Sequence, residues 1–328
     1  MPIAKIRAEI NESKARQLGR IVKKLRYKPI SFNSPDLFPE GDEFIYTNYM
    51  FFLVAIDHRT HPENKRFEAE IGGKFYHGSD LMYFLARKIQ KERPDFFTAE
   101  NLVRITAKDL TKVFSIGNVT IRGVAERAML LRDCAKKLID YHKGDFRNLL
   151  RSSEGYLLRM DKKGVLQQLR TFKAYEDPLM KKSFLLIKIL KRQKYFEPAD
   201  VENLSLPVDN VLLEVGLRSG VVNVANVKDF EGVIKLSKED VEILRNLTKE
   251  AFEIVSRESK VPPDILDDLI WTFGREVYRI ERDKIDKIEN IVTPLNANIE
   301  NKKALKDFLT FISYNVSIKF KFPNTWYF

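Results

Sequence analysis

The segment that most constrains the fold of this chain covers residues 180–190 and reads Met-Lys-Lys-Ser-Phe-Leu-Leu-Ile-Lys-Ile-Leu. It is apolar enough to form a core helix, yet it contains three lysines. Transferring an ammonium group into a protein core costs free energy unless the group is paired or its pKa falls. A lysine whose pKa is lowered can act as a nucleophile or carry a proton. The segment therefore predicts a buried helix with a functional amine.

Helical spacing separates the three lysines. Lys181, Leu185 and Lys188 follow one another at intervals of four and three residues, so they share one helical face. Lys182 points about 100° away from Lys181, and is either a rival for the same role or an exposed residue. The ordinary alternative for each lysine is that its stem packs on the core while the ammonium group reaches water at the edge.

A single aspartate, Asp209, follows Pro207 and Val208 shortly after this segment. Its position before an apolar stretch is typical of a helix N-cap. A carboxylate held at the start of a helix also suits a catalytic acid or base, so both roles remain open.

A third group lies further along the chain, where Asp267 and Trp271 are four residues apart and share a helical face. An indole can stack on a flat heterocycle while a neighbouring carboxylate accepts hydrogen bonds from it. The ordinary alternative is a core tryptophan beside a solvated aspartate.

Composition bounds the class of protein. The net charge of +11 favours a polyanionic partner such as nucleic acid or a nucleotide. The 57 basic and 46 acidic residues also fit a charged surface of the thermophile type. The one cysteine, Cys134, falls in an amphipathic helical pattern, so neither a disulfide framework nor a cysteine-based metal site can form.

The N-terminus lacks the apolar core of a signal peptide, and no apolar run reaches membrane-spanning length. We therefore expect a soluble, cytoplasmic protein without a membrane partner. The oligomeric state is left open.

Helical periodicity dominates the sequence. One alternating stretch, residues 67–78, predicts a small β-hairpin that turns at Gly72 and Gly73. Residues 44–56 are strongly apolar and aromatic, and periodicity alone does not decide between helix and strand there. The expected fold class is mostly α with a small β-hairpin or sheet element.

The length of 328 residues allows one large domain or two ordinary ones. No internal repeat, low-complexity tract or linker divides the sequence. We expect residues 1–328 to form a single unit, or two packed lobes of about residues 1–150 and 151–328.

The order of these groups resembles that of the helix-hairpin-helix DNA glycosylase superfamily, and within it the archaeal 8-oxoguanine DNA glycosylases. Those enzymes carry a catalytic lysine before an apolar run, which falls on Lys181, and a catalytic aspartate in a Pro-Val-Asp segment, which falls on Asp209. A third motif of that family matches residues 258–271, which contain Val-Pro-Pro and Leu-Asp-Asp-Leu-Ile-Trp. The resemblance implies a DNA-glycosylase-like helical fold.

Most of the chain also resembles the queuosine salvage proteins, which are nucleotide N-glycosylases of related fold. Their lysine helix is similar to residues 181–186, and their aromatic segment and glycine-rich hairpin are similar to residues 46–58 and 72–81. The chain departs from that family at residues 57–61, Asp-His-Arg-Thr-His, where the family has a Phe/Trp pair after an asparagine. This departure bears on which nucleotide base the chain would recognise.

Asp57, His58 and His61 are residue types that ligate metals. On a polar turn, however, such a cluster is more often a surface loop or one that contacts substrate. We therefore expect no metal and no cofactor.

The two resemblances imply an N-glycosylase that acts on a modified nucleotide with a purine-like or 7-deazapurine base. Asp209 would stabilise an oxocarbenium ion at C1′, or instead add to C1′ or activate water. Lys181 would either attack C1′ or bind the phosphate. Trp271 and Asp267 would hold the base. The remaining candidates for substrate binding are Lys182, Leu185, Lys188, Asp57, His58 and Tyr76.

Two alternatives stand beside this function. The first is a DNA glycosylase with lyase activity that removes 8-oxoguanine from damaged DNA. The glycines of residues 113–125 lack the spacing of the usual backbone-amide phosphate clamp, which argues against duplex DNA. The second is a non-catalytic nucleic-acid-binding protein on the same scaffold.

Overall fold

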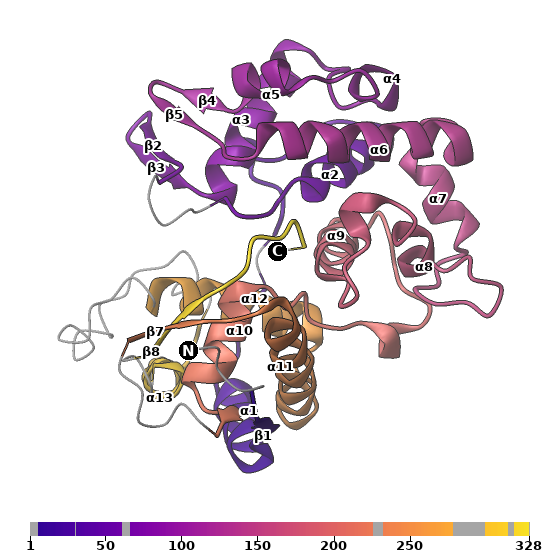
Figure 1. The fold of residues 1–328 in the computed structure, drawn as a ribbon. Helices are drawn as coiled ribbons and strands as arrows, with labels where there is room; N and C mark the ends of the chain where they lie inside the picture. The colour runs from indigo at the N-terminus through magenta and orange to yellow at the C-terminus, as the bar shows by residue number, and fades with distance from the viewer. Residues whose placement is uncertain are drawn as a thin grey trace. The chain divides into compact units, whose positions relative to one another are not determined.

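The computed structural model describes residues 6–29, 31–60, 66–225, 232–277, 299–313 and 318–327. Within these ranges it contains thirteen α-helices and four two-stranded sheets (Figure 1). The mostly α fold class predicted from the sequence is confirmed.

The chain divides into two compact units. The first comprises residues 1–30 and 204–324, and the second comprises residues 31–203 and 325–328. The position near residue 150, considered above as a lobe boundary, falls inside helix α7 (Phe146–Ser152) of the second unit.

The first unit joins the beginning of the chain to its C-terminal part. Its elements are β1 (Ala8–Ile10), α1 (Glu12–Leu25), α10 (Asn210–Arg218), β6 (Val222–Val224), β7 (Gly232–Lys235), α11 (Lys238–Ser259), α12 (Pro263–Val277), α13 (Lys302–Ile312) and β8 (Ile318–Lys321). Strands β1 and β6 pair antiparallel, and β7 and β8 pair in parallel. Helix α1 packs closely on α11 at Gly19. A Cβ at this position would lie only 2.6 Å from Cβ of Glu258, so the close approach requires glycine.

The second unit is continuous apart from its last few residues. Before α7 it contains α2 (Glu43–Ala55), β2 (Glu68–Ile71), β3 (Lys74–His77), α3 (Ser79–Glu92), α4 (Ala99–Leu102), α5 (Ala107–Val113), β4 (Ser115–Ile116), β5 (Val119–Thr120) and α6 (Val124–His142). After α7 follow α8 (Val165–Leu169), η1 (Lys173–Tyr175), α9 (Lys181–Arg192) and η2 (Val201–Asn203).

Helix α2 forms the core of the second unit. It begins at an N-cap, Asp42, whose side chain accepts a hydrogen bond from the Ile45 amide, and every residue from 46 to 55 is buried. Helices α6, α7 and α9 contact it. Because partners surround α2, its sequence has no polar stripe, which is why periodicity could not identify this segment as a helix.

The hairpin predicted at residues 67–78 is confirmed. Strands β2 and β3 pair antiparallel, and the turn between them places Gly72 at φ +57° and Gly73 at φ +77°. Glycine occupies this left-handed region at little cost. The hairpin leads directly into α3, which begins at Ser79.

An aromatic cluster around Phe51 fills the core beside α2. The Phe51 ring stacks on Phe146 and Tyr175, with ring centroids 4.6 Å and 5.5 Å apart. The Phe52 and Phe172 rings meet it edge-on. Such pairs add to the free energy gained by burying their area.

We expect Phe51→Ala to lower the free energy of unfolding by about 3–5 kcal/mol, since it removes a fully buried ring and leaves a cavity. Urea unfolding followed by circular dichroism measures the change. Phe75→Ala is the control, because Phe75 is 61% exposed and its loss should change the free energy by no more than about 0.5 kcal/mol. Equal effects of the two substitutions would contradict the assignment of the core.

Candidate functional site

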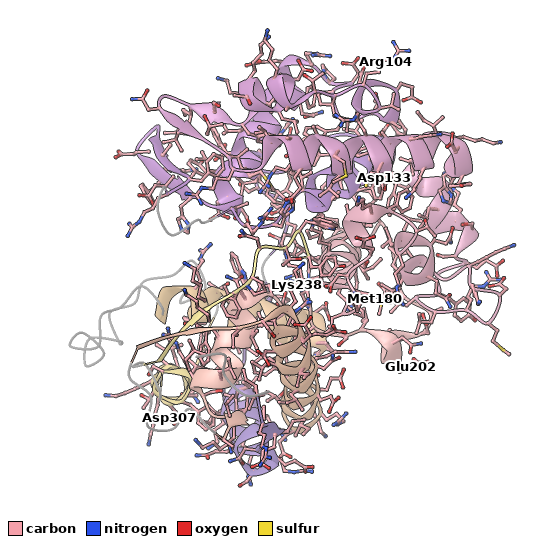
Figure 2. The ribbon with its side chains drawn as sticks, viewed as in Figure 1. Arg104, Asp133, Met180, Glu202, Lys238 and Asp307 are labelled. Carbon is pink, nitrogen blue, oxygen red and sulfur yellow. The ribbon has the colours of Figure 1, made fainter. Side chains whose placement is uncertain are left out.

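Helix α9 begins at Lys181 because Asp177 holds the preceding turn. One carboxylate oxygen of Asp177 accepts from the Lys181 amide at 2.9 Å, and the other accepts from the Leu179 amide at 3.3 Å. Met180, labelled in Figure 2, has a left-handed conformation with φ 56° and turns the chain into the helix. The two lysines of interest are therefore the first two residues of α9.

Lys182 is fully buried, so the interpretation of this residue as exposed is wrong. Its Nζ donates to the carbonyl oxygen of Ala55, the last residue of α2, and lies 3.1 Å from Nδ1 of His58. Burial, followed by the positive charges of Lys181 and Arg127, holds the pKa of Lys182 well below its ordinary value. Of the two lysines, it is Lys182 that best fits the amine with a lowered pKa expected from the sequence.

His58 lies at the centre of this group, with a side chain that has no exposed area. Its Nε2 lies 2.9 Å from Oε1 of Glu126 and 3.1 Å from Nη1 of Arg127. Arg127 also donates to the His58 carbonyl oxygen. Burial, then the charges of Lys182 and Arg127, lowers the pKa of His58 well below its usual range. Burial also lowers the pKa of Arg127, to about 10.

Asp57 and Lys181 complete the group. The Asp57 carboxylate accepts a hydrogen bond of 2.8 Å from the hydroxyl of Ser79, the first residue of α3. Nζ of Lys181 lies 3.4 Å from the Asp57 carbonyl oxygen, and 7% of the residue is exposed. We refer to Asp57, His58, Glu126, Arg127, Lys181 and Lys182 as the His58 cluster.

The C-terminal end of α2 explains why so many cations gather here. The last carbonyl groups of a helix lack partners within the helix and carry a partial negative charge. In this unit the carbonyl oxygens of Ala55, Asp57 and His58 accept from Lys182, Lys181 and Arg127, respectively. The last carbonyl of α2 and two carbonyls just beyond it thus accept from three buried cations of α6 and α9.

The other candidates of the second unit lie on the same or nearby elements. Lys188 is nearly buried on α9, with its Nζ 5.5 Å from the centroid of the Phe32 ring, and Leu185 is partly buried one turn earlier. Tyr76, on β3, packs its ring against Phe84 and donates to Asp36 at 3.4 Å.

The metal hypothesis involved Asp57, His58 and His61. Among the residues that the structure describes, no three His, Cys, Asp or Glu side chains are grouped so that they could hold a metal ion. His61 lies outside the described residues. Asp57 and His58 instead take part in the His58 cluster.

Asp209 lies in the first unit and caps α10, as the sequence predicts. Its Oδ1 accepts from the Leu212 amide at 2.9 Å, and its Oδ2 accepts from the indole Nε1 of Trp271 at 3.0 Å. The preceding carbonyl, of Val208, accepts from both Nε and Nη2 of Arg245 at 3.0 Å and 2.8 Å. Helices α10 and α12 therefore hold this carboxylate, and α11 holds the backbone carbonyl that precedes it.

Trp271 and Asp267 lie on α12 of the same unit. The Trp271 ring is partly exposed, and the guanidinium carbon of Arg275 lies 4.5 Å from its centroid. Asp267 is buried, so the alternative of a solvated aspartate is wrong. The partial exposure of Trp271 likewise differs from a core tryptophan.

The predicted residues thus form two groups. Asp57, His58, Lys181 and Lys182 are brought together in the second unit, whereas Asp209 and Trp271 are brought together in the first. Joint action of the two groups stays a prediction.

Two buried arginines were missed by the sequence reasoning. Arg127 shares a helical face with Leu131, Cys134 and Leu138, and all four side chains are buried. Arg245 interrupts a similar buried face of α11. Both arginines could have been found from the sequence, because each is a cation inside an apolar helical face, the same pattern that identified the lysines of α9.

We expect the protein to lose stability as the pH falls below about 6.5, the ordinary pKa of histidine. In the unfolded chain the His58 imidazole takes up a proton in this range, whereas in the folded chain burial and neighbouring cations keep its pKa lower. Acidification therefore favours the unfolded chain. His58→Asn should flatten the dependence of the thermal midpoint on pH, and an unchanged slope would contradict this account.

His142→Asn provides the control for this measurement. Burial alone lowers the pKa of His142, and this residue is only partly buried. Its substitution should flatten the pH dependence less than the substitution of His58 does.

No helix in the described part of the chain is both long and apolar enough to span a membrane.

Comparison with known proteins supports one of the resemblances seen in the sequence. Residues 38–196 match the family model of the queuosine salvage protein, which confirms that resemblance for this part of the chain. The match includes α2, α6 and α9 with the His58 cluster, and ends before Asp209. No curated protein matches the chain.

Among solved structures, the chain is similar to the 8-oxoguanine DNA glycosylase from Pyrobaculum aerophilum, crystallised with 8-oxoguanosine. The sequence identity is 14%, the TM-score is 0.44, and the alignment covers 95% of this chain and 90% of that one.

Proposed function

We propose that this chain is an N-glycosylase that hydrolyses the bond between a modified, 7-deazapurine-like base and the ribose of a nucleoside monophosphate. The main support is the match of residues 38–196 to the queuosine salvage family, a stretch that contains the lysine-bearing helix α9. A second support is the carboxylate of Asp209, which donors from α10 and α12 hold in place.

In the proposed reaction, the bond between C1′ and the base nitrogen breaks, and its electron pair leaves with the base. Positive charge then develops at C1′ and the ring oxygen, and the Asp209 carboxylate stabilises it. Water adds to C1′ and loses a proton, while the departing base gains one. The products are the free base and ribose 5-phosphate, and no cofactor is needed.

Lys181 is assigned to the phosphate group of the substrate. A lysine ammonium is a strong donor to phosphate oxygens, and Lys181 keeps some exposure while Lys182 has none. Lys182 in turn supports the region around Lys181 by holding the end of α2.

We expect the protein to release the free base from queuosine 5′-monophosphate, measured by chromatography. Asp209→Asn should lower kcat by roughly a hundred- to a thousandfold, since it removes the charge that stabilises the transition state. Asparagine is also a good N-cap, so α10 should remain folded. Asp42→Asn, the same change at the N-cap of α2, is the matched control and should keep full activity. Full activity of Asp209→Asn would refute the mechanism.

Lys181→Met should raise KM by about ten- to a hundredfold, the range for losing a hydrogen bond to a charged group. Lys191→Met, on the same helix, is the control and should leave KM unchanged. A fall in kcat at unchanged KM would instead indicate that Lys181 takes part in the chemical step.

The net charge of +11 also favours nucleic acid as a partner, so damaged DNA belongs in the same assay. A lysine that attacks C1′ forms a Schiff base, which borohydride reduces to a stable covalent adduct. If the protein is trapped on an 8-oxoguanine oligonucleotide and releases no base from the nucleotide, the function is that of a DNA glycosylase with lyase activity. Binding of nucleic acid without any base release would indicate a non-catalytic protein.

A further inference from the structure

The connection between Trp271 and Asp209 joins residues that are 62 positions apart in the chain. Sequence reasoning assigned Trp271 to the base, as a stacking surface. In the structure, its only polar side-chain atom, the indole nitrogen, donates to the Asp209 carboxylate. We propose, on the basis of the function proposed above, that Trp271 is a positioning residue, whose N–H fixes the Asp209 carboxylate as a rigid anion.

Close packing of α12 on α10 makes this hydrogen bond possible. A Cβ on Gly274 would lie 2.6 Å from Cγ2 of Val215, so the two helices approach at a point where α12 has no side chain. Trp271 precedes Gly274 by three residues and therefore lies on a neighbouring part of the same helical face. From there its side chain reaches the first turn of α10, which Asp209 caps.

Trp271 is itself held in one orientation. The Arg275 guanidinium lies 4.5 Å from the centre of the indole, one helical turn further along α12. A cation at this distance from a ring is attracted to its face. Arg275 therefore occupies one face of the ring, whereas the edge carrying the N–H is used by Asp209.

These contacts bear on what Asp209 can do. Both of its oxygens accept hydrogen bonds, one from a backbone amide and one from the indole. Donors to a carboxylate favour its charged form. An anion that two donors hold in one orientation suits electrostatic stabilisation of C1′ better than it suits proton abstraction from water or attack on carbon.

The experiment compares Trp271→Phe with Trp326→Phe. The chain has two tryptophans, and both donate their indole N–H, but Trp326 donates to the backbone carbonyl of Lys173. Trp271→Phe should lower kcat about ten- to a hundredfold with KM nearly unchanged, the range for one hydrogen bond to a charged group. The acidic limb of its pH–rate profile should move to higher pH, because a carboxylate that loses a donor is protonated more readily. Trp326→Phe should change neither quantity.

A double-mutant cycle separates action through Asp209 from direct contact with the base. In the Asp209→Asn background, Trp271→Phe should lower the rate less than about threefold, because the anion that the indole fixes is already gone. If Trp271→Phe lowers the rate equally in both backgrounds, or raises KM without lowering kcat, the proposal is overturned. Either result would indicate that Trp271 contacts the base directly.

A measurement that needs no activity keeps this proposal separate from the proposed function. In protein labelled with ¹⁵N-tryptophan, Trp326→Phe assigns the two indole N–H signals. The Trp271 signal should shift in Asp209→Asn, and should follow the protonation of Asp209 in the wild-type protein as the pH falls. If the Trp271 N–H signal does not respond, the inference about Trp271 is overturned, whether or not base is released. If the signal responds but no base is released, the contact is supported and the proposed function is refuted.

Discussion

The cost of burying positive charge governs the second unit, and the C-terminal end of α2 offsets it. Lys182, Lys181 and Arg127 each donate to a carbonyl oxygen within the last residues of that helix or just beyond it. Without those acceptors, the buried cations would lose hydrogen bonds that offset the cost of leaving water. These polar contacts therefore help to fix the positions of α9 and α6 around α2, in addition to the aromatic cluster around Phe51.

A helix end has a comparable role in the first unit, with the opposite sign. Asp209 caps the N-terminus of α10, where free amide groups favour a negative charge. The contact from Trp271 and the hold of Arg245 on the preceding carbonyl restrict the same residue further. In each unit, a candidate functional charge is thus stabilised first by the end of a helix and then by side chains from other helices.

Local patterns in the sequence were sufficient for the fold class, the hairpin at Gly72 and Gly73, and the N-cap role of Asp209, because each depends on residues a few positions apart. Helix α2 was ambiguous, since burial on every face removes the periodic signal. The burial of Lys182 could not be predicted from its own helix, because it depends on acceptors at Ala55 and His58, about 125 positions earlier. The bond between Trp271 and Asp209 has the same origin: both residues were identified, but their contact is set by the packing of α12 on α10.

The burial of residues 46–55 of α2 has a consequence for how the chain folds during synthesis. Residues 46–55 leave the ribosome long before α9 exists, since Lys182 follows Ala55 by 127 positions. At translation rates of about 5–20 residues per second, the interval is about 6–25 s. During that time the face of α2 that α9 covers in the folded unit is exposed, and exposed apolar surface of this kind favours association with other chains. Of the helices that contact α2, α6 and α7 are made before α9.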